Sequence, residues 1–343
     1  MDRKAILLML SLTFLFGCKE SNVNEIYFTE NIDNLKTDSI EIKTLSGCCI
    51  ISDRIGIEGI GLTDNYIILT YQDTDSLIGI YDVTGKEVMV VGKRGQGPND
   101  FINTVITGQH GDNNHYIWIN DVSMSLLKRV NIDLTIASKK CVVDQQHQTL
   151  PRSANAFSLS DSSIISEEMT EDNYVLERMT KDGETILKEK MYKFNIPGPF
   201  SYYKSSMCIN EAQSTLCAAM HSVNQVNFYN YSTRDRKSVT IGNVATKDKI
   251  VTNIDTGIPD WVYYASTYAT PNYFYCLYLD QCYEDAYEKG KNTEIHVFTP
   301  TGNLIRIIKL DKYIISFSVN DSDDTLYGIY EDSAIYKYNL TLN

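Results

Sequence analysis

Several features that define common protein classes are scarce in this chain of 343 residues. Its seven prolines and 19 glycines are too few for a collagen-like or disordered chain, and it has only two tryptophans. Acidic residues outnumber basic ones by 44 to 31, which leaves a formal net charge of −13 and no overall basic footprint for nucleic acid. Beyond the N-terminus no apolar run reaches about 18 residues, so we expect no later segment to enter a membrane.

Catalytic and metal-binding signatures are also missing. The chain has no Gly-x-Ser-x-Gly elbow, Walker loop, His-Glu-x-x-His pattern or Cys-x-x-Cys pair. His110 and His115 flank a Gly-Asp-Asn-Asn segment, which we interpret as a solvated turn in preference to a metal site. The segment 320–324 offers oxygen ligands for calcium, yet it lacks the glycine and distal glutamate of an EF-hand loop. We therefore predict no cofactor, with calcium at 320–324 as the alternative.

The N-terminus has the order of a targeting signal. A short charged start precedes an apolar run over 5–16, which is too short to span a bilayer comfortably, and Gly17-Cys18 follows it. This ending resembles the bacterial lipoprotein signal, in which the cysteine becomes the lipidated first residue. An ordinary signal peptide that happens to contain Cys18 is the alternative. We predict a signal peptide over 1–17, lipid on Cys18 and a polar tether over 18–37.

A lipid on Cys18 would hold the protein to a membrane without a spanning helix. Lys19-Glu20 follows the cysteine, and the absence of aspartate there favours outer-membrane sorting by analogy with other bacterial lipoproteins. The pair also resembles a truncated surface-export tag. We expect a lipid-anchored outer-membrane protein that faces the periplasm or the cell surface.

From residue 38 onward, short strands recur with a period of about fifty residues, and helical periodicity is hard to find. The turns 82–86, 180–184 and 299–303 occupy the same place in their units, and each puts glycine where a hairpin needs a positive φ. Six units of four strands predict an all-β fold, a six-bladed β-propeller with four-stranded antiparallel blades. A seven-bladed ring and a pair of β-sandwiches are the alternatives.

The sixth unit lacks a fourth strand at the C-terminus. The segment Ser39–Leu45 alternates between polar and apolar residues and has no partner of its own. We therefore predict that this N-terminal strand completes the last blade and closes the ring. No linker divides the chain, so 38–343 is expected to form one monomeric propeller.

One motif follows the first complete unit, which ends at Val91. It reads Gly-x-Gly-Pro-x-acidic-Phe and comprises Gly95, Gly97, Pro98, Asp100 and Phe101. Together with the signal and the repeat, this motif resembles the TolB-like six-bladed propeller lipoproteins. Asn99 and Asp100 depart mildly from the small residue and the glutamate that are usual there. Members of that family mostly lack an assigned function, so the resemblance implies a fold and little chemistry.

The motif has an architectural interpretation and a functional one. As a latch, its glycines permit sharp turns, Pro98 fixes one dihedral angle, Asp100 accepts hydrogen bonds from loop amides and Phe101 plugs between blades. As an anion cradle, its loop N–H groups would act together with Lys93 and Arg94. We favour the latch.

Seven cysteines remain beyond Cys18. Bridges between Cys208 and Cys217 or between Cys276 and Cys282 are conceivable, whereas reduced and mostly buried thiols are the favoured interpretation. Cys141 has the surroundings of a buried strand residue.

Long connections carry function on rigid scaffolds, and in a propeller the loops between blades share one face with those between second and third strands. We expect that face to include 93–101, 144–152, 192–204, 242–259 and 280–293. The candidate binding residues within or beside these loops are Lys93, Arg94, Tyr202, Tyr203, Trp261, Tyr263, Tyr264, Tyr283 and Tyr287. We predict a binding module for a protein, peptide or glycan. The alternative is a lactonase-like or lyase-like enzyme with its site at the central channel.

Overall fold

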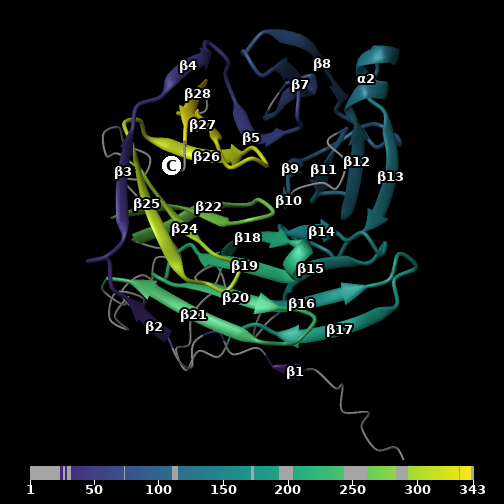
Figure 1. The fold of residues 1–343 in the computed structure, drawn as a ribbon. Helices are drawn as coiled ribbons and strands as arrows, with labels where there is room; N and C mark the ends of the chain where they lie inside the picture. The colour runs from purple at the N-terminus through teal and green to yellow at the C-terminus, as the bar shows by residue number, and fades with distance from the viewer. Residues whose placement is uncertain are drawn as a thin grey trace, which may run out of the picture.

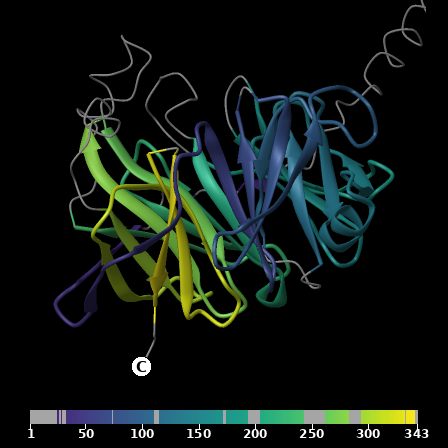
Figure 2. The same cartoon turned by 90° about the horizontal axis from the view of Figure 1, so that it is seen from above.

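The computed structural model describes residues 24–25, 28, 32–72, 74–109, 115–170, 174–192, 204–242, 261–282, 293–331 and 333–340. Within these ranges six small sheets stand in a ring (Figure 1). Seen from the side, the strands of each sheet run between the two faces of the ring (Figure 2). The predicted six-bladed β-propeller is confirmed. Among the described residues, no helix is long and apolar enough to cross a membrane.

Each blade is antiparallel, and its strands follow the chain from the channel outward. Blade 1 contains β5 (Ile57–Leu62), β6 (Tyr66–Tyr71), β7 (Ser76–Asp82) and β8 (Glu87–Lys93). Blade 2 contains β9 (Thr104–Ile106), β11 (Tyr116–Asp121), β12 (Leu126–Asn131) and β13 (Val143–Gln148). Blade 3 contains β14 (Ala156–Ser158), β15 (Ile164–Met169), β16 (Tyr174–Met179) and β17 (Thr185–Lys190).

The second half of the ring follows the same plan. Blade 4 contains β18 (Ser205–Asn210), β19 (Thr215–Met220), β20 (Val226–Asn230) and β21 (Arg236–Ile241). Blade 5 contains β22 (Trp261–Ala269), β23 (Phe274–Cys282), β24 (Glu294–Phe298) and β25 (Leu304–Leu310). Blade 6 contains β26 (Ile314–Val319), β27 (Thr325–Tyr330) and β28 (Ala334–Asn339).

The N-terminal segment runs around the outer rim of half the ring (Figure 1). Strands β1 (Asn24–Glu25), β2 (Ile32–Leu35) and β3 (Glu41–Leu45) pair in parallel with the outer strands of blades 3, 4 and 5. Strand β4 (Cys48–Ile51) then pairs antiparallel with β28 and completes blade 6. Part of the expected tether therefore belongs to the fold, since it contributes Phe28 and β2.

The ring is closed by an N-terminal strand, but by a different one from the strand we predicted. Ser39–Leu45 does not complete blade 6, because Glu41–Leu45 forms a fifth strand on blade 5, where Glu41 pairs with Arg306 at 2.6 Å between Oε2 and Nη2. The closing strand is Cys48–Ile51. Its four residues do not alternate between polar and apolar, so the sequence pattern did not reveal it.

The glycine turns behave as predicted. Gly85, Gly183 and Gly302 have φ values of 92°, 85° and 73°. In each turn the glycine N–H donates to the carbonyl three residues earlier, as from Gly85 to Asp82 at 2.9 Å, and strand pairing shifts register beside the turn. A glycine in this conformation next to a bulge is the expected way to close such hairpins.

Blade 2 departs from the expected pattern. A short helix, α2 (Ile132–Ser138), interrupts it, and the side chain of Asn131 caps the helix by accepting from the N–H of Leu134. The expected loop 144–152 is also wrong in its first half, because β13 extends to Gln148. Seven helical residues are too few to show a period of 3.6.

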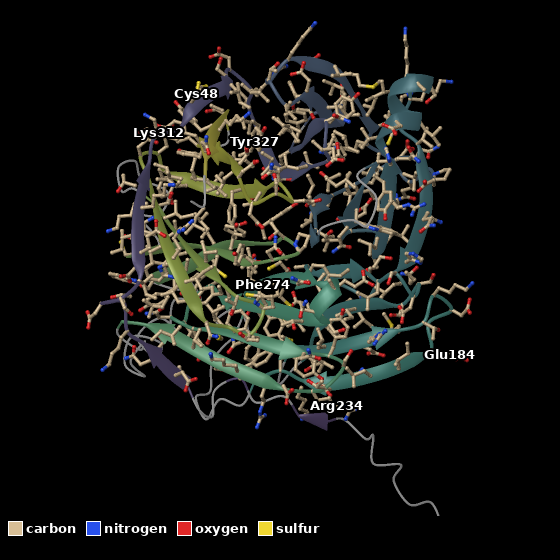
Figure 3. All side chains as sticks on the ribbon, viewed as in Figure 1. Cys48, Glu184, Arg234, Phe274, Lys312 and Tyr327 are labelled. Atoms are coloured by element: carbon tan, nitrogen blue, oxygen red, sulfur yellow. The ribbon has the colours of Figure 1, made fainter. Side chains whose placement is uncertain are left out.

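Hydrophobic side chains pack mainly between neighbouring blades. Phe274 lies in one such layer (Figure 3), where its ring is 5.8 Å from that of Phe228 on the adjacent blade. The same layer holds Cys217 and Cys276, whose sulfur atoms are 3.8 Å apart. All seven cysteines in the described part of the chain are free thiols.

Candidate functional site

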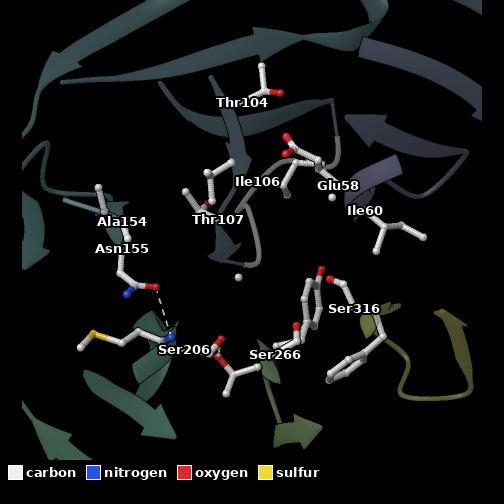
Figure 4. A pocket seen from close by; sticks show the side chains of 18 of the residues that line it. Glu58, Ile60, Thr104, Ile106, Thr107, Ala154, Asn155, Ser206, Ser266 and Ser316 are labelled. Atoms are coloured by element: carbon white, nitrogen blue, oxygen red, sulfur yellow. Dashed lines mark hydrogen bonds between the residues drawn. The ribbon is translucent and has the colours of Figure 1, made fainter. Parts of the chain in front are cut away.

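The innermost strands of the blades surround a cavity of about 680 Å³, which we call the throat (Figure 4). A second cavity of about 780 Å³, the mouth, shares several wall residues with it, including Val105, Asn155 and Ser206. The inner strands line both cavities, so we treat the mouth and the throat as two parts of one site in the central channel. Their volumes are those of pockets that hold small ligands or the tip of a larger one.

The mouth opens on the face that carries the long connections. Val105, Val262 and Ile315 lie near the starts of inner strands, and His221 and Glu331 directly follow second strands. Both positions belong to the face shared by the loops between blades and those between second and third strands. We call this the loop-rich face. The mouth therefore lies where the sequence predicts a binding surface.

The opposite end of the throat is partly closed by a short strand, β10 (Gly108–Gln109). It leaves blade 2 and pairs in parallel with Cys208 and Ile209 of β18. A Cβ atom on Gly108 would lie 2.9 Å from the carbonyl oxygen of Thr267, so glycine allows this close crossing. This crossing narrows the end of the throat that lies away from the mouth.

The lining of the throat combines uncharged polar and apolar side chains with the charged Glu58 and Lys204. Ser206, Ser266 and Ser316 come from three consecutive blades, and Asn155 of blade 3 and Thr107 of blade 2 continue the ring beyond Ser206 (Figure 4). Hydroxyl and amide groups both donate and accept hydrogen bonds. The wall can therefore hydrogen-bond a polar ligand, and Glu58 and Lys204 add one charge of each sign to the lining.

The inner strands bulge where they meet the cavity. Pairing skips one residue at Glu58 in β5, at Ala265 in β22 and at Ile315 in β26, and all three residues line the channel. A bulge places an extra side chain and redirects it, and bulges gather near functional sites. Sequence periodicity could not reveal them, because a bulge breaks the alternation on which it relies.

Asn155 joins blade 3 to blade 4 at the channel wall. Its Nδ2 donates to Oε1 of Glu167 at 2.5 Å and to the carbonyl of Ser205 at 3.1 Å. Its Oδ1 accepts from the N–H of Met207 at 3.2 Å, the bond drawn as a dashed line in Figure 4. Every polar atom of the amide is engaged. Asn155 therefore couples the channel wall to the carboxyl group behind it.

Glu167 is 3% exposed, and its Oε2 has no hydrogen-bond partner among the described residues. Burial raises the pKa of this carboxyl to about 7, against the opposing effects of Asn155 and the positive charge of Lys204. His221 lines the mouth, and burial together with Lys204 lowers its pKa to about 4. At neutral pH the imidazole is therefore uncharged and the carboxyl is partly protonated. Sequence reasoning missed both residues, because neither lies in a recognisable motif and 54 positions separate them.

Within the described ranges, no group of three or more His, Cys, Asp or Glu side chains is arranged to hold a metal ion. The oxygens of 320–324 make a turn instead: Asn320 accepts from the N–H groups of Asp324 and Thr325, and Asp323 accepts from Tyr275. His115 lies 2.7 Å from a carboxylate oxygen of Asp133. His110 lies outside the described residues.

The predicted latch has the contacts expected of it. Phe101 is fully buried in the layer between blades 1 and 2. The N–H of Gly97 donates to Oδ2 of Asp100 at 3.0 Å, and that of Gly95 donates to the carbonyl of Phe101 at 3.0 Å. The protein's own acceptors therefore occupy the amides that an anion cradle would need. Lys93 is exposed, as is Pro98.

A buried lysine completes the latch. Lys128 of β12 has no exposed side-chain surface, donates to the carbonyl of Asp100 and lies 3.7 Å from Oδ2 of Asp121. Its ammonium is also 4.7 Å from the centre of the Phe101 ring. Arg94 is exposed, and its guanidinium donates to the carbonyl of Ile102 at 3.1 Å. Sequence reasoning found the loop but not Lys128, which lies 27 residues beyond Phe101.

The aromatic candidates within the described residues lie in strand β22 and not in a loop. Tyr264 is fully buried and its hydroxyl is 3.1 Å from Nδ1 of His296, and Tyr263 is 4% exposed. Their expected surface position is therefore wrong, because both rings pack between blades 4 and 5. Trp261 is half-buried beside the mouth and donates to Asp280 at 2.9 Å.

The remaining sequence-predicted site residues lie outside the described ranges. They are Cys18, Tyr202, Tyr203, Tyr283 and Tyr287. The four tyrosines belong to connections whose described ends, Lys204 and Cys282 among them, reach the loop-rich face. Their part in binding stays a prediction.

Two solved structures with the same fold come from Bacteroides species. An exported protein of Bacteroides fragilis is 14% identical, with 92% of this chain and 98% of that chain covered and a TM-score of 0.53. A member of the DUF4221 family from Bacteroides vulgatus is 13% identical, with 85% and 93% covered and a TM-score of 0.53. At these identities the likeness concerns the fold alone.

Among curated proteins the sequence has no match. The model of one family, described as TolB-like 6-blade propeller-like, does match, over residues 59–322. That range begins in β5 and ends after β26, so it includes all but the last two strands of the ring and the N-terminal segment. With the blade count, the glycine turns and the latch in agreement, the chain belongs to the TolB-like six-bladed propeller family.

Proposed function

We propose that this protein is an envelope lipoprotein whose propeller binds a protein, peptide or glycan at the loop-rich face, with the mouth of the channel at the centre of the binding surface. The observation that carries the proposal is the mouth itself, a cavity of about 780 Å³ that continues into a polar throat. Such a graded pocket suits a ligand that places a polar group deep and an apolar part at the rim.

The lining supports this ligand class. Val105, Val262, Leu279 and Ile315 surround the mouth, while serine and threonine hydroxyls and the Asn155 amide surround the throat. Apolar contact supplies affinity, and a few fixed polar groups supply orientation. Sugar rings and peptide side chains both combine apolar faces with hydrogen-bonding edges.

The proposed location is the outer membrane, reached through the signal over 1–17 and lipid on Cys18. The Gly17-Cys18 ending supports this proposal, and the structurally similar Bacteroides fragilis protein is described as exported. Metabolic labelling with an alkyne fatty acid tests it. The natural chain should incorporate label and fractionate with the outer membrane, and Cys18→Ser should do neither.

Isothermal titration tests the binding role. Protein lacking residues 1–21 is titrated with muropeptides and with envelope polysaccharide fragments. Ser206→Trp places an indole in the throat and should abolish a signal seen with the natural sequence. Ser232→Trp, on an exposed turn of blade 4, is the matched control and should bind normally. Binding that survives Ser206→Trp would exclude the throat as the site.

One observation favours an enzyme as the second candidate. Glu167 combines a pKa of about 7 with a position directly behind the channel residue Asn155, and such a carboxyl can exchange protons at neutral pH. A lactonase-like or lyase-like activity at the channel would use it as an acid or base. Assays with lactones and uronic-acid oligosaccharides test this role, since Glu167→Gln should remove the activity.

A further inference from the structure

The N-terminal segment is fixed to the ring a short distance after Cys18. Phe28 is fully buried, and its N–H donates to the carbonyl of Met191 at 3.1 Å. Its own carbonyl accepts from the side chains of Gln225 and Ser238. These contacts join the segment to blades 3 and 4, so the chain cannot leave the rim there without exposing a core phenylalanine.

The attachment extends back to β1. Asn24 and Glu25 pair in parallel with Glu189 and Lys190 of β17, the outer strand of blade 3. Asn24 is the sixth residue after Cys18, and an extended chain over these six steps spans at most about 20 Å. A lipid on Cys18 therefore holds the outer rim of blade 3 within about 20 Å of the membrane surface.

We propose that the outer rim of blade 3 is the membrane-facing surface of the anchored protein, and that blade 6 is the far side. This inference rests on the proposed lipidation of Cys18. Blades 3 and 6 are opposite in a six-membered ring, and Figure 3 shows Glu184 of blade 3 and Cys48 of blade 6 on opposite sides of the molecule. Ile186, 51% exposed on β17, gives the near rim an apolar contact for lipid.

This placement has a consequence for the channel. The first described residues of the segment, Asn24 and Glu25, pair with the outer edge of blade 3, so we expect the mouth on the loop-rich face to stay open to ligands beside the membrane. An anchor that covered the mouth would instead compete with ligand.

Fluorescence quenching tests the placement. Full-length acylated protein is reconstituted into phosphatidylethanolamine–phosphatidylglycerol vesicles that contain headgroup-nitroxide lipid. A bimane dye is attached at Glu184→Cys in one variant and at Cys48 in the other, with the remaining exposed and half-exposed thiols replaced by serine. We expect several-fold stronger quenching at position 184 than at position 48. Equal quenching at the two positions, or stronger quenching at Cys48, overturns the placement.

Tether length supplies the decisive control. Insertion of about 12 Gly and Ser residues after Ser21 adds about 20 Å of flexible reach and should weaken quenching at position 184. If quenching at position 184 is unchanged by the insertion, the inference is also overturned, because the short tether would then not be what holds blade 3 near the membrane. Failure of the lipid anchor itself is distinguishable, since mass spectrometry would show no acyl chain on Cys18 and no protein would associate with the vesicles.

Discussion

The side-chain amide of Asn155 donates a hydrogen bond of 2.5 Å to Oε1 of Glu167, and this contact links the channel wall to a buried carboxyl. Asn155 faces the throat and also binds blade 4, while Glu167 lies behind it with a second oxygen that has no partner among the described residues. The protonation of the Glu167 carboxyl therefore affects both the channel wall and the contact between blades 3 and 4.

The first prediction concerns stability against pH. Burial raises the pKa of Glu167 to about 7 in the folded protein, above its ordinary value near 4.5, so the folded state binds the proton more tightly than the unfolded state. The stabilising contribution of Glu167 to the free energy of unfolding is therefore complete at low pH and is lost as the pH rises from about 4.5 to about 7. The loss amounts to about 3 kcal/mol at most. Urea unfolding between pH 5 and 8 should give a flatter profile for Glu167→Gln than for the natural chain. Glu168→Gln is the neighbouring control, and an unchanged slope in Glu167→Gln would rule out Glu167 as the source.

His221 should have the opposite effect on how the free energy of unfolding changes with pH. Burial and Lys204 lower its pKa to about 4, below the ordinary 6.5, so the unfolded state binds the proton more tightly. Its contribution is present above about pH 6.5 and is lost as the pH falls towards 4. NMR titration of the imidazoles should show, at pH 5.5, a neutral histidine resonance that disappears in His221→Gln, whereas the resonance of the fully buried His296, whose pKa burial also lowers, should remain. A spectrum in which all five histidines titrate near 6.5 would contradict the burial of this residue.

Phe101 should be a major source of stability. Its ring is fully buried between blades 1 and 2 beneath Lys128, and removing a buried phenylalanine side chain costs about 3 to 5 kcal/mol. Phe101→Ala should lower the free energy of unfolding by that amount in chemical denaturation. Val90→Ala on the outer strand of blade 1, where the side chain is 37% exposed, should change it by less than about 1 kcal/mol. Similar effects of the two substitutions would show that the motif is not a latch.

Thiol chemistry should separate the cysteines into two groups. Cys48 and Cys49 are exposed, whereas Cys208, Cys217 and Cys276 are fully buried, and burial raises the pKa of Cys217 and Cys276. Folded protein should react with Ellman's reagent rapidly at the first two and not at the last three. In guanidinium chloride all should react. A loss of two thiols in denatured protein purified from the envelope would instead indicate a disulfide bridge.

The sequence revealed those parts of the fold that depend on local chemistry. Gly85, Gly183 and Gly302 mark equivalent turns because each hairpin needs a positive φ there, and the spacing of such turns indicates the blades. The latch was also recognisable, since its glycines, Asp100 and Phe101 contact one another within a few residues.

Features that depend on distant pairing were missed. Cys48–Ile51 completes a blade with β28, almost 290 residues later, and nothing in its own pattern indicates that partner. Tyr263 and Tyr264 were predicted to lie on a binding surface. Their burial depends on packing against the neighbouring blade, which the sequence pattern of their own strand does not indicate. The Asn155–Glu167 contact also depends on blade 4, which buries the carboxyl and provides two of the partners of the amide.

We propose that the ligand binds at the mouth of the channel. Photocrosslinking in living cells tests it most directly, with benzoylphenylalanine in place of Leu279 at the mouth and, as the control, in place of Ser232 on a turn of blade 4. We predict a discrete ultraviolet-dependent adduct at position 279, absent at position 232 and lost when Ser206→Trp is added. Adducts at position 232 but not at position 279, or an adduct at 279 that persists with Ser206→Trp, would contradict the account.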